Sequence, residues 1–457
     1  MIAAGGAWRV LAALGVTWLA GWALARRLSP ELTRTETAAW SAAAGLLLQA
    51  GLFGLRAAAG IDPGGGGLLA GNAVAIGAAF LIPGRRSRRS LTPPTRPRGP
   101  LDPMAIFAGS VAALAFLAFL VPAVAEPMWS TDFLAIWGMK GKAMSLAGSL
   151  PGRIFHDPAL YWSHREYPLL VPLCLAAIAG LAGGWNDQAL AILFPAVELS
   201  TLVLLYGFLR RRTGSPRAGA VAAALAALCF PLYHPVNAGT AEIPFAFGAV
   251  LAACATLDAL SGPSGAAYGR LFAAALFCAG AKQEGTLFAF LLAGALLLAS
   301  RMRGKALALA WRSAGVLVLV PAMHWVLLRA LRGSQSRRDF DFHLFAPAGW
   351  PELAERFASV ASRMALREGR EALVALVAIA LFLLVTRRSL ADLLLPVLAA
   401  QIGFYAVAFS VSSFDPMYAV DGAFRRIATT LFPALSLVLA SRLATAKDRP
   451  AGDAPRV

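Results

Sequence analysis

The feature that most constrains this chain is a series of apolar runs, each close to twenty residues long, that recur along most of its length. Met104–Ala125 and Ala189–Leu209 are two of these runs, and short basic stretches separate many of them. A run of about 20 apolar residues matches the hydrocarbon thickness that a helix must cross. Barrel strands would alternate polar and apolar residues, and these runs do not alternate. The pattern therefore predicts an all-α polytopic membrane protein and excludes a soluble globular domain.

The composition of the chain agrees with a membrane location. Its residues are 58% hydrophobic and 14% charged, whereas soluble domains carry about 25% charged residues. The formal net charge of +17 does not indicate a nucleic-acid partner, because the arginines lie at the ends of apolar runs, where positive charge marks cytoplasmic loops. The cysteines lie inside apolar segments without metal-ligand spacing and predict no disulfide framework. They are Cys174, Cys229, Cys254 and Cys278.

The apolar runs divide into about thirteen predicted membrane-spanning helices. The first three form an N-terminal accessory unit over 1–83, and 84–103 is a basic, proline-rich cytoplasmic linker. The other spans form a transmembrane core over 104–440, and 441–457 is predicted to be a disordered cytoplasmic tail. The predicted spans are residues 7–25, 38–59, 67–83, 104–125, 188–209, 216–235, 241–260, 268–281, 285–300, 311–330, 371–386, 390–411 and 424–440.

The positive-inside rule gives the predicted orientation. When the arginines of 84–103 are placed in the cytoplasm, two long loops, 126–187 and 331–370, lie outside. The apolar stretch 168–183 decides the rest of the topology. If it crossed the membrane, three arginine clusters would lie outside, at residues 210–212, 301–303 and 387–388. We therefore expect 168–183 to be a helix at the outer surface or a re-entrant segment of a multi-pass protein in the inner or plasma membrane.

Three acidic residues lie at predicted helix starts on the outer side of the membrane. Asp132 follows one span, Glu166 precedes the proline that opens 168–183, and Glu242 opens the span 241–260. All three positions are compatible with favourable helix N-terminal electrostatics, and also with acid–base catalysis. If they are only caps, nothing requires them to face one another. If they form a site, they should converge on one cavity, with a basic residue opposite them.

Five basic residues on the same side are candidates for binding a lipid phosphate. Phe133–Leu146 has the pattern of an interfacial amphipathic helix, with Ile136 and Leu146 on its apolar face and Lys140 on the other. Arg425 and Arg426 open the last span against the positive-inside trend, which favours an anionic ligand, with lipid head-group contact as the alternative. The candidates are Lys140, Lys142, Lys282, Arg425 and Arg426.

The order of these motifs resembles a known family. A span is followed by an early aspartate within residues 129–137, then by the Glu-Tyr-Pro-Leu-Leu motif at 166–170, and later by the Lys-x-Glu-Gly turn within 281–285. Over about 104–440 this arrangement is similar to the GT-C glycosyltransferases. Within them it is most similar to the protein O-mannosyltransferase and lipid A aminoarabinose transferase group. The chain departs from the pattern with Glu242 where Asp is common, and with Tyr167 where the aminoarabinose transferases have a phosphate-binding lysine.

The resemblance implies transfer of a sugar from a polyprenyl-phosphate donor to a glycan, lipid or protein acceptor. Asp132 would be the general base, and Glu166 and Glu242 would be the other catalytic carboxylates. Basic side chains would stabilise the lipid-phosphate leaving group, so that no general acid is needed. A divalent metal ion held by Glu166 and His343 is a further, weaker expectation. Membrane lipid is expected to surround the spans, and an apolar groove between them is expected to hold the prenyl chain.

Two other functions remain open from the sequence. A transporter or flippase of lipid-linked saccharide would favour inverted repeats and ionisable residues in mid-membrane. The chain shows no such repeat, and its charges cluster at one face. A structural membrane protein would need no acidic cluster at all.

Overall fold

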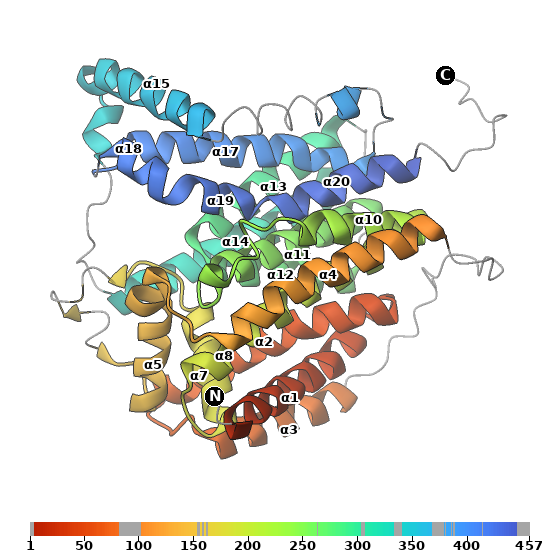
Figure 1. The fold of residues 1–457 in the computed structure, drawn as a ribbon, viewed down its shortest axis with the longest axis vertical. Helices are drawn as coiled ribbons and strands as arrows, with labels where there is room; N and C mark the ends of the chain where they lie inside the picture. The colour runs from red at the N-terminus through yellow and green to blue at the C-terminus, as the bar shows by residue number, and fades with distance from the viewer. Residues whose placement is uncertain are drawn as a thin grey trace.

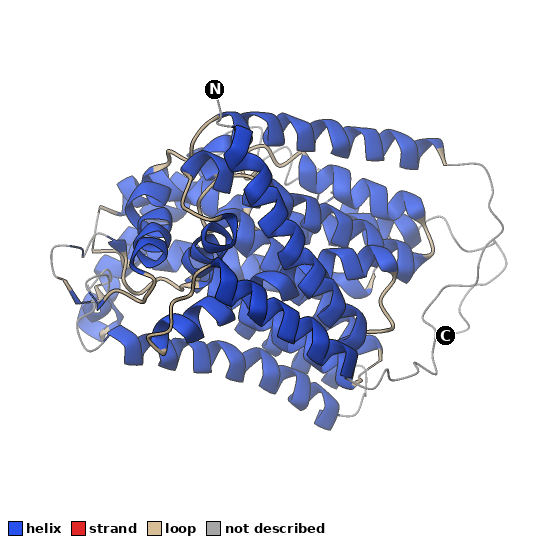
Figure 2. Cartoon of the chain, turned by 90° about the horizontal axis from the view of Figure 1, so that it is seen from below, coloured by secondary structure: helices blue, strands red, loops and turns tan. Residues whose placement is uncertain are grey.

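The computed structural model describes residues 4–81, 102–152, 156–157, 160, 163–262, 264–302, 307–332, 341–367, 379, 381–384, 386, 389–413 and 415–445. These residues form helices joined by loops, with no strand among them (Figure 2). The α-helices are α1 (Ala4–Leu28), α2 (Arg34–Ala58), α3 (Gly65–Leu81), α4 (Pro103–Ala125), α5 (Gly138–Ala147), α7 (Leu170–Ala182), α8 (Asp187–Leu190), α9 (Leu193–Thr213), α10 (Pro216–Ala227), α11 (Glu242–Ser261), α12 (Gly265–Ala281), α13 (Gln283–Met302), α14 (Leu307–Arg332), α15 (Trp350–Arg367), α17 (Leu394–Ser410), α18 (Pro416–Ala419), α19 (Arg425–Thr429) and α20 (Phe432–Thr445). The π-helical turns are η1 (Phe133–Trp137) and η7 (Val420–Phe424), and the 3-10 turns are η3 (Pro235–Asn237), η4 (Phe342–Phe345), η5 (Pro347–Gly349) and η6 (Leu390–Leu393).

Eight helices of the described residues are long and apolar enough to cross a membrane. A ninth span results if the bent pair Pro416–Thr429 and Phe432–Ala444 counts as one crossing. The predicted count of thirteen is not confirmed, because three predicted spans are shorter helices: α3 and α12 have 17 residues each, and α10 has 12. The predicted span 371–386 lies largely outside the described residues, as do most of the linker 84–103 and residues 446–457 of the tail. Residues 441–445 of the predicted tail are helical, because α20 continues to Thr445.

The long helices lie side by side in one bundle (Figure 1), and α11 lies at its centre. The spanning window of α11 is entirely buried, and the helix packs against α9, α12, α13 and α20. By contrast, α4 exposes most of its apolar surface, including Leu114 and Val121. Helices that are apolar on every face are buried in large proteins or face lipid. A multi-pass membrane protein accounts for both helices.

The helix α11 defines the two ends of the bundle. Glu242 is its first residue, and Asp258 lies near its last turn, about 24 Å further along the axis at 1.5 Å per residue. We call these the Glu242 end and the Asp258 end. The first coincides with the predicted outer side and the second with the predicted cytoplasmic side.

The predicted surface stretch 168–183 forms helix α7, which does not run the length of the bundle. Near its start, Leu170 lies against Gly280 at the end of α12, and near its end the carbonyl of Gly180 lies against Gly65, the first residue of α3. Both contacts are at the Glu242 end, so α7 lies across that end, next to α5 (Figure 1). The helix is buried at most of its positions and packs against α5, α1 and α2, and its place relative to the membrane, at the surface or re-entrant, stays a prediction.

The N-terminal helices pack directly on the core. Helix α2 contacts α7, α9 and α12. Its crossing with α1 is close, because a Cβ atom on Gly21 would lie 1.9 Å from the carbonyl oxygen of Ser41. Small residues at such crossings let membrane helices approach closely.

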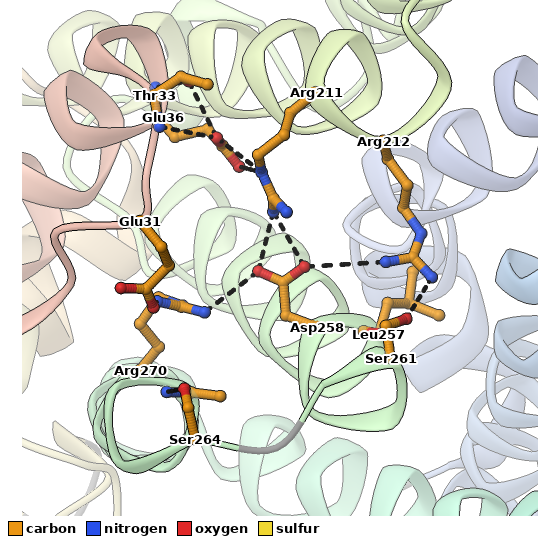
Figure 3. Close-up of polar contacts among 11 residues, drawn as sticks. Glu31, Thr33, Glu36, Arg211, Arg212, Leu257, Asp258, Ser261, Ser264 and Arg270 are labelled. Atoms are coloured by element: carbon orange, nitrogen blue, oxygen red, sulfur yellow. Dashed lines mark hydrogen bonds and ion pairs between the residues drawn. The ribbon is translucent and has the colours of Figure 1, made fainter. Parts of the chain in front are cut away.

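An ion-pair network at the Asp258 end joins α2, α9, α11 and α12 (Figure 3). The Arg211 guanidinium on α9 donates from Nε to Glu36 at 2.8 Å and from Nη2 to Asp258 at 2.9 Å. Arg270, at the start of α12, contacts Asp258 at 3.4 Å and also pairs with Glu31. Glu36 is part of the capping box with Thr33 that begins α2. The network therefore connects the start of one N-terminal helix to three helices of the core.

Candidate functional site

Arg426 joins two of the three predicted carboxylates at the Glu242 end. Its Nη1 lies 2.7 Å from Oδ2 of Asp132, and its Nε lies 3.2 Å from Oε1 of Glu242. Arg426 lies on α19, Asp132 directly precedes η1, and Glu242 is the first residue of α11. Three elements that are distant in the sequence therefore bring these side chains together.

Lys282 extends the cluster to a fourth position. Its Nζ lies 3.2 Å from Oε1 of Glu242 and 3.0 Å from Oε1 of Glu284. Burial of Lys282 opposes its positive charge, but the two carboxylates outweigh this effect and raise the pKa of the ammonium above its ordinary value. Lys282 is therefore charged and bridges two acidic residues.

The backbone around Lys282 explains its buried position. Lys282 is extended, with φ −154° and ψ 153°, and it separates α12 from α13. Gly285 follows in the first turn of α13, where a Cβ atom would lie 1.9 Å from the carbonyl oxygen of Cys278. Only glycine fits so close to a neighbouring backbone. The tight break between the two helices holds Lys282 inside the bundle.

Glu166 lies beside this cluster but pairs with a different residue. Its Oε1 lies 3.0 Å from Nδ1 of His164, and Gln283 donates a hydrogen bond to its backbone carbonyl at 3.0 Å. Burial of Glu166 disfavours its charge, but the hydrogen bond with His164 and the nearby positive charges together lower the pKa of the carboxyl below its ordinary value. Glu166 thus anchors the loop in front of α7.

Tyr167 connects Glu166 to the rest of the cluster. Its ring stacks on Trp137 and on His164, with ring centroids 5.3 and 4.6 Å away. Burial and four neighbouring carboxylates raise the pKa of its hydroxyl well above the ordinary value. These carboxylates belong to Glu284, Glu166, Asp132 and Glu242. All three predicted catalytic acids therefore lie near one phenol.

The position of Lys140 differs from the sequence prediction. The sequence pattern places this residue on the polar face of an interfacial helix, yet its side chain is 0% exposed, and its Nζ donates to the carbonyl oxygen of His164 at 2.6 Å. Leu146, predicted for the apolar face, is 73% exposed. Periodicity alone cannot tell which face of a short helix meets the protein. Lys140 therefore supports the loop of Glu166, and its binding of a lipid phosphate stays a prediction.

The other predicted residues lie apart from the Arg426 contacts. Lys142 is half-exposed and lies 3.6 Å from Asp187. Arg425 lies near Cys229. His343 is in η4, which packs against α15. Among the described residues no group of three His, Cys, Asp or Glu side chains is arranged to hold a metal ion, and a metal at Glu166 and His343 stays a prediction.

The two charge clusters differ in exposure and in balance. At the Asp258 end, Arg211 is 6% exposed and binds two carboxylates through both sides of its guanidinium. At the Glu242 end, Arg426 is 30% and Asp132 is 26% exposed, above a buried Glu242. Here, within the described part of the chain, Asp132, Glu242 and Glu284 form ion pairs with two cations, Arg426 and Lys282. This partly open group, with reactive side chains at its surface, suits ligand binding better than the closed network does.

Sequence reasoning missed three residues in or near this region. Tyr167 lies in the Glu-Tyr-Pro-Leu-Leu motif and Glu284 in the Lys-x-Glu-Gly turn, but neither was predicted as a site residue. Glu198 lies in an apolar run on α9 and is fully buried. The signal for Glu198 was present, because a single carboxyl inside a predicted span is expensive and often functional.

Comparisons with protein-family models, with curated proteins and with solved structures find no match to this chain.

Proposed function

We propose that this chain is an integral membrane glycosyltransferase that moves a sugar from a polyprenyl-phosphate donor to an acceptor. The observation that carries the proposal is the convergence of Asp132 and Glu242 on Arg426. Asp132 makes no capping hydrogen bond to the helical turn that it precedes, so the cap interpretation does not account for it. Like charges held together are costly unless a cation or ligand compensates them. We place this end of the bundle at the outer face of the membrane.

The proposed reaction assigns one role to each side chain. Asp132 takes the proton of an acceptor hydroxyl, whose oxygen then attacks the anomeric carbon of the donor. The bond from that carbon to the phosphate oxygen breaks, and its electron pair leaves with the lipid phosphate. Arg426 and Lys282 supply positive charge for the leaving phosphate. Glu242 is buried and holds both cations in place.

A second candidate function is a transporter or flippase of lipid-linked saccharide. The specific observation in its favour is Glu198, an ionisable residue inside the candidate span Asp187–Thr213. Transporters place such residues near the middle of the membrane. The site around Arg426 favours the transferase, because it gathers acids and bases at one end of the bundle.

The test compares Asp132→Asn with wild-type protein purified into lipid nanodiscs. A panel of polyprenyl phosphates carrying radiolabelled sugars serves as donor, and loss of label from the lipid fraction to added acceptors is measured. Asp132→Asn keeps the size of the side chain and removes its basicity, so we expect transfer to fall about 10²–10⁴-fold. Asp62→Asn is the matched control, because Asp62 is an exposed residue of the turn between α2 and α3. It should transfer at the wild-type rate.

Two outcomes would contradict the proposal. Full transfer by Asp132→Asn would remove Asp132 from the mechanism. Absence of transfer by wild-type protein that nevertheless moves labelled lipid across vesicle bilayers would favour the flippase.

A further inference from the structure

Glu198 carries a carboxyl group inside the bundle that has neither a hydrogen bond nor an ion pair among the described residues. It lies on the second turn of α9, about 22 Å from the Thr213 end of that helix at 1.5 Å per residue. Its side chain is 0% exposed, and neither carboxyl oxygen has a hydrogen-bond partner among the described residues. No cationic side chain of the described residues forms an ion pair with it. An ionised carboxylate in such a place loses its hydration and receives nothing in exchange.

One buried polar side chain of another segment, that of Tyr233, lies near Glu198. Tyr233 follows α10 and is near enough to Glu198 to interact with it electrostatically. Its hydroxyl is also buried, and it forms no hydrogen bond of ordinary geometry among the described residues, although Thr201 is close. Cys229 is the next titratable group beyond Tyr233, and Arg425 lies beyond Cys229.

The backbone that carries Tyr233 is irregular at this depth. Helix α10 ends at Ala227, and residues 228–241 form turns and the short η3 before α11 begins. Non-helical backbone within a membrane is tolerated only where protein or a polar cavity surrounds it. The Tyr233 ring is fixed in the bundle beside Phe119 of α4, at 6.1 Å between ring centroids. The non-helical segment 228–241 thus carries a buried hydroxyl, that of Tyr233, near the buried acid Glu198.

We propose that Glu198 is a proton-binding site inside the membrane, in which its side chain is a neutral carboxylic acid. A carboxylate that binds a proton there loses its charge, which removes the cost of burying that charge without a partner. The hydroxyl of Tyr233 is a buried polar group near this acid, but it is not hydrogen-bonded to it. This inference does not depend on the proposed sugar transfer, in which Glu198 touches no reacting group.

The test is infrared difference spectroscopy of wild-type protein against Glu198→Gln at neutral pH. A protonated carboxylic acid has a carbonyl stretching band that a carboxylate lacks. We expect the wild-type minus Glu198→Gln spectrum to contain this acid band. In Tyr233→Phe the band should remain, because burial and the lack of an ion pair, and not a hydrogen bond from Tyr233, keep Glu198 neutral. Glu284→Gln is the matched control, and its difference spectrum should contain carboxylate bands, since Glu284 pairs with Lys282.

Two results would contradict the proposal. Carboxylate bands in the Glu198 difference spectrum would overturn the proposal, because they would show an ionised side chain. Loss of the acid band in Tyr233→Phe would also contradict it, because the hydroxyl, and not burial, would then keep the acid protonated. If Glu198→Gln does not fold, Glu198→Asp takes its place, since it keeps an acid of different length. A shifted acid band then supports the proposal, and the absence of any acid band contradicts it.

Discussion

At the scale of single residues, Arg426 is the side chain on which the candidate site depends. Its guanidinium contacts Asp132 through Nη1 and Glu242 through Nε, so it holds two acids in fixed directions. A lysine ammonium is a point charge on a flexible stem and lacks this fork geometry. The site therefore needs the shape of arginine as well as its charge.

The first prediction concerns Arg426→Lys. We expect kcat/KM for transfer to fall roughly tenfold to a hundredfold, because loss of one hydrogen bond to a charged group costs about 1.5–3 kcal/mol. The measurement is the donor assay with purified protein. Arg363→Lys is the control, since Arg363 pairs with Asp421 at the exposed surface, and it should change the rate less than twofold. An unchanged rate in Arg426→Lys would show that the fork geometry is not needed.

The second prediction uses the lowered pKa of Glu166. A carboxyl whose pKa is depressed by folding stabilises the native state above its ordinary value of 4.5, and this stabilisation is lost as the pH falls through the lowered pKa. We expect the unfolding temperature of Glu166→Gln in detergent to fall less than that of wild type between neutral pH and pH 4 or below. Parallel pH profiles for the two proteins would refute this contribution.

At the scale of elements, the network at the Asp258 end connects the N-terminal helices to the core. Arg211 of α9 bridges Glu36 of α2 and Asp258 of α11. Buried charges of this kind are weak evidence for added stability, but removal of one partner leaves the other charge uncompensated. We interpret the network as a device that holds α2 in register with α9 and α11.

The third prediction tests this interpretation. Glu36→Gln should destabilise the folded protein by about 3–5 kcal/mol, the typical cost of breaking a buried pair. Because the two residues share one interaction, a double-mutant cycle of Glu36→Gln with Arg211→Gln should show strong coupling. Unfolding in denaturing detergent is the measurement. The exposed ion pair of Arg363 with Asp421 serves as the control. Arg363→Gln should lower the free energy of unfolding by less than about 1 kcal/mol. Additive effects at Glu36 and Arg211 would mean that the pair does not couple the helices.

At the scale of the whole molecule, the bundle has two ends about 24 Å apart, measured along α11 from Glu242 to Asp258. Helix α7 lies across one end and does not pass through to the other. This arrangement agrees with the charge argument that residues 168–183 do not cross, and the helix is buried at most of its positions. It allows the three arginine clusters at 210–212, 301–303 and 387–388 to lie on the predicted cytoplasmic side.

The fourth prediction is the topology itself. The native cysteines Cys174, Cys229, Cys254 and Cys278 are all buried, so introduced cysteines can be labelled against a low background. An impermeant thiol reagent applied to intact cells should label Leu146→Cys and should label Gly262→Cys only after permeabilisation. Both positions are exposed, at the Glu242 end and the Asp258 end respectively. Labelling of Gly262→Cys in intact cells would contradict the proposed orientation, because the Asp258 end would then be accessible from outside.

The chain by itself determined its class, because only helices and closed barrels satisfy backbone hydrogen bonds in lipid, and its long apolar runs lack the alternation of barrel strands. Sequence position also predicted that Asp132 and Glu242 lie on one side of the membrane, since each follows or opens a span. Only the tertiary structure decided which cation they meet. The contact of Arg426 with both acids joins residues nearly three hundred positions apart, and no local pattern encodes such a distance.

Burial was likewise decided by the tertiary structure. Lys140 is buried and Leu146 is exposed, the reverse of their predicted faces, because α5 packs on α7. The predicted count of thirteen spans is not confirmed for a related reason, since α10 and α12 are short helices that pack in the bundle, and periodicity cannot reveal such packing. Hydropathy measures the cost of leaving water. It does not distinguish lipid from protein as the apolar surroundings, and only the packed fold makes that choice.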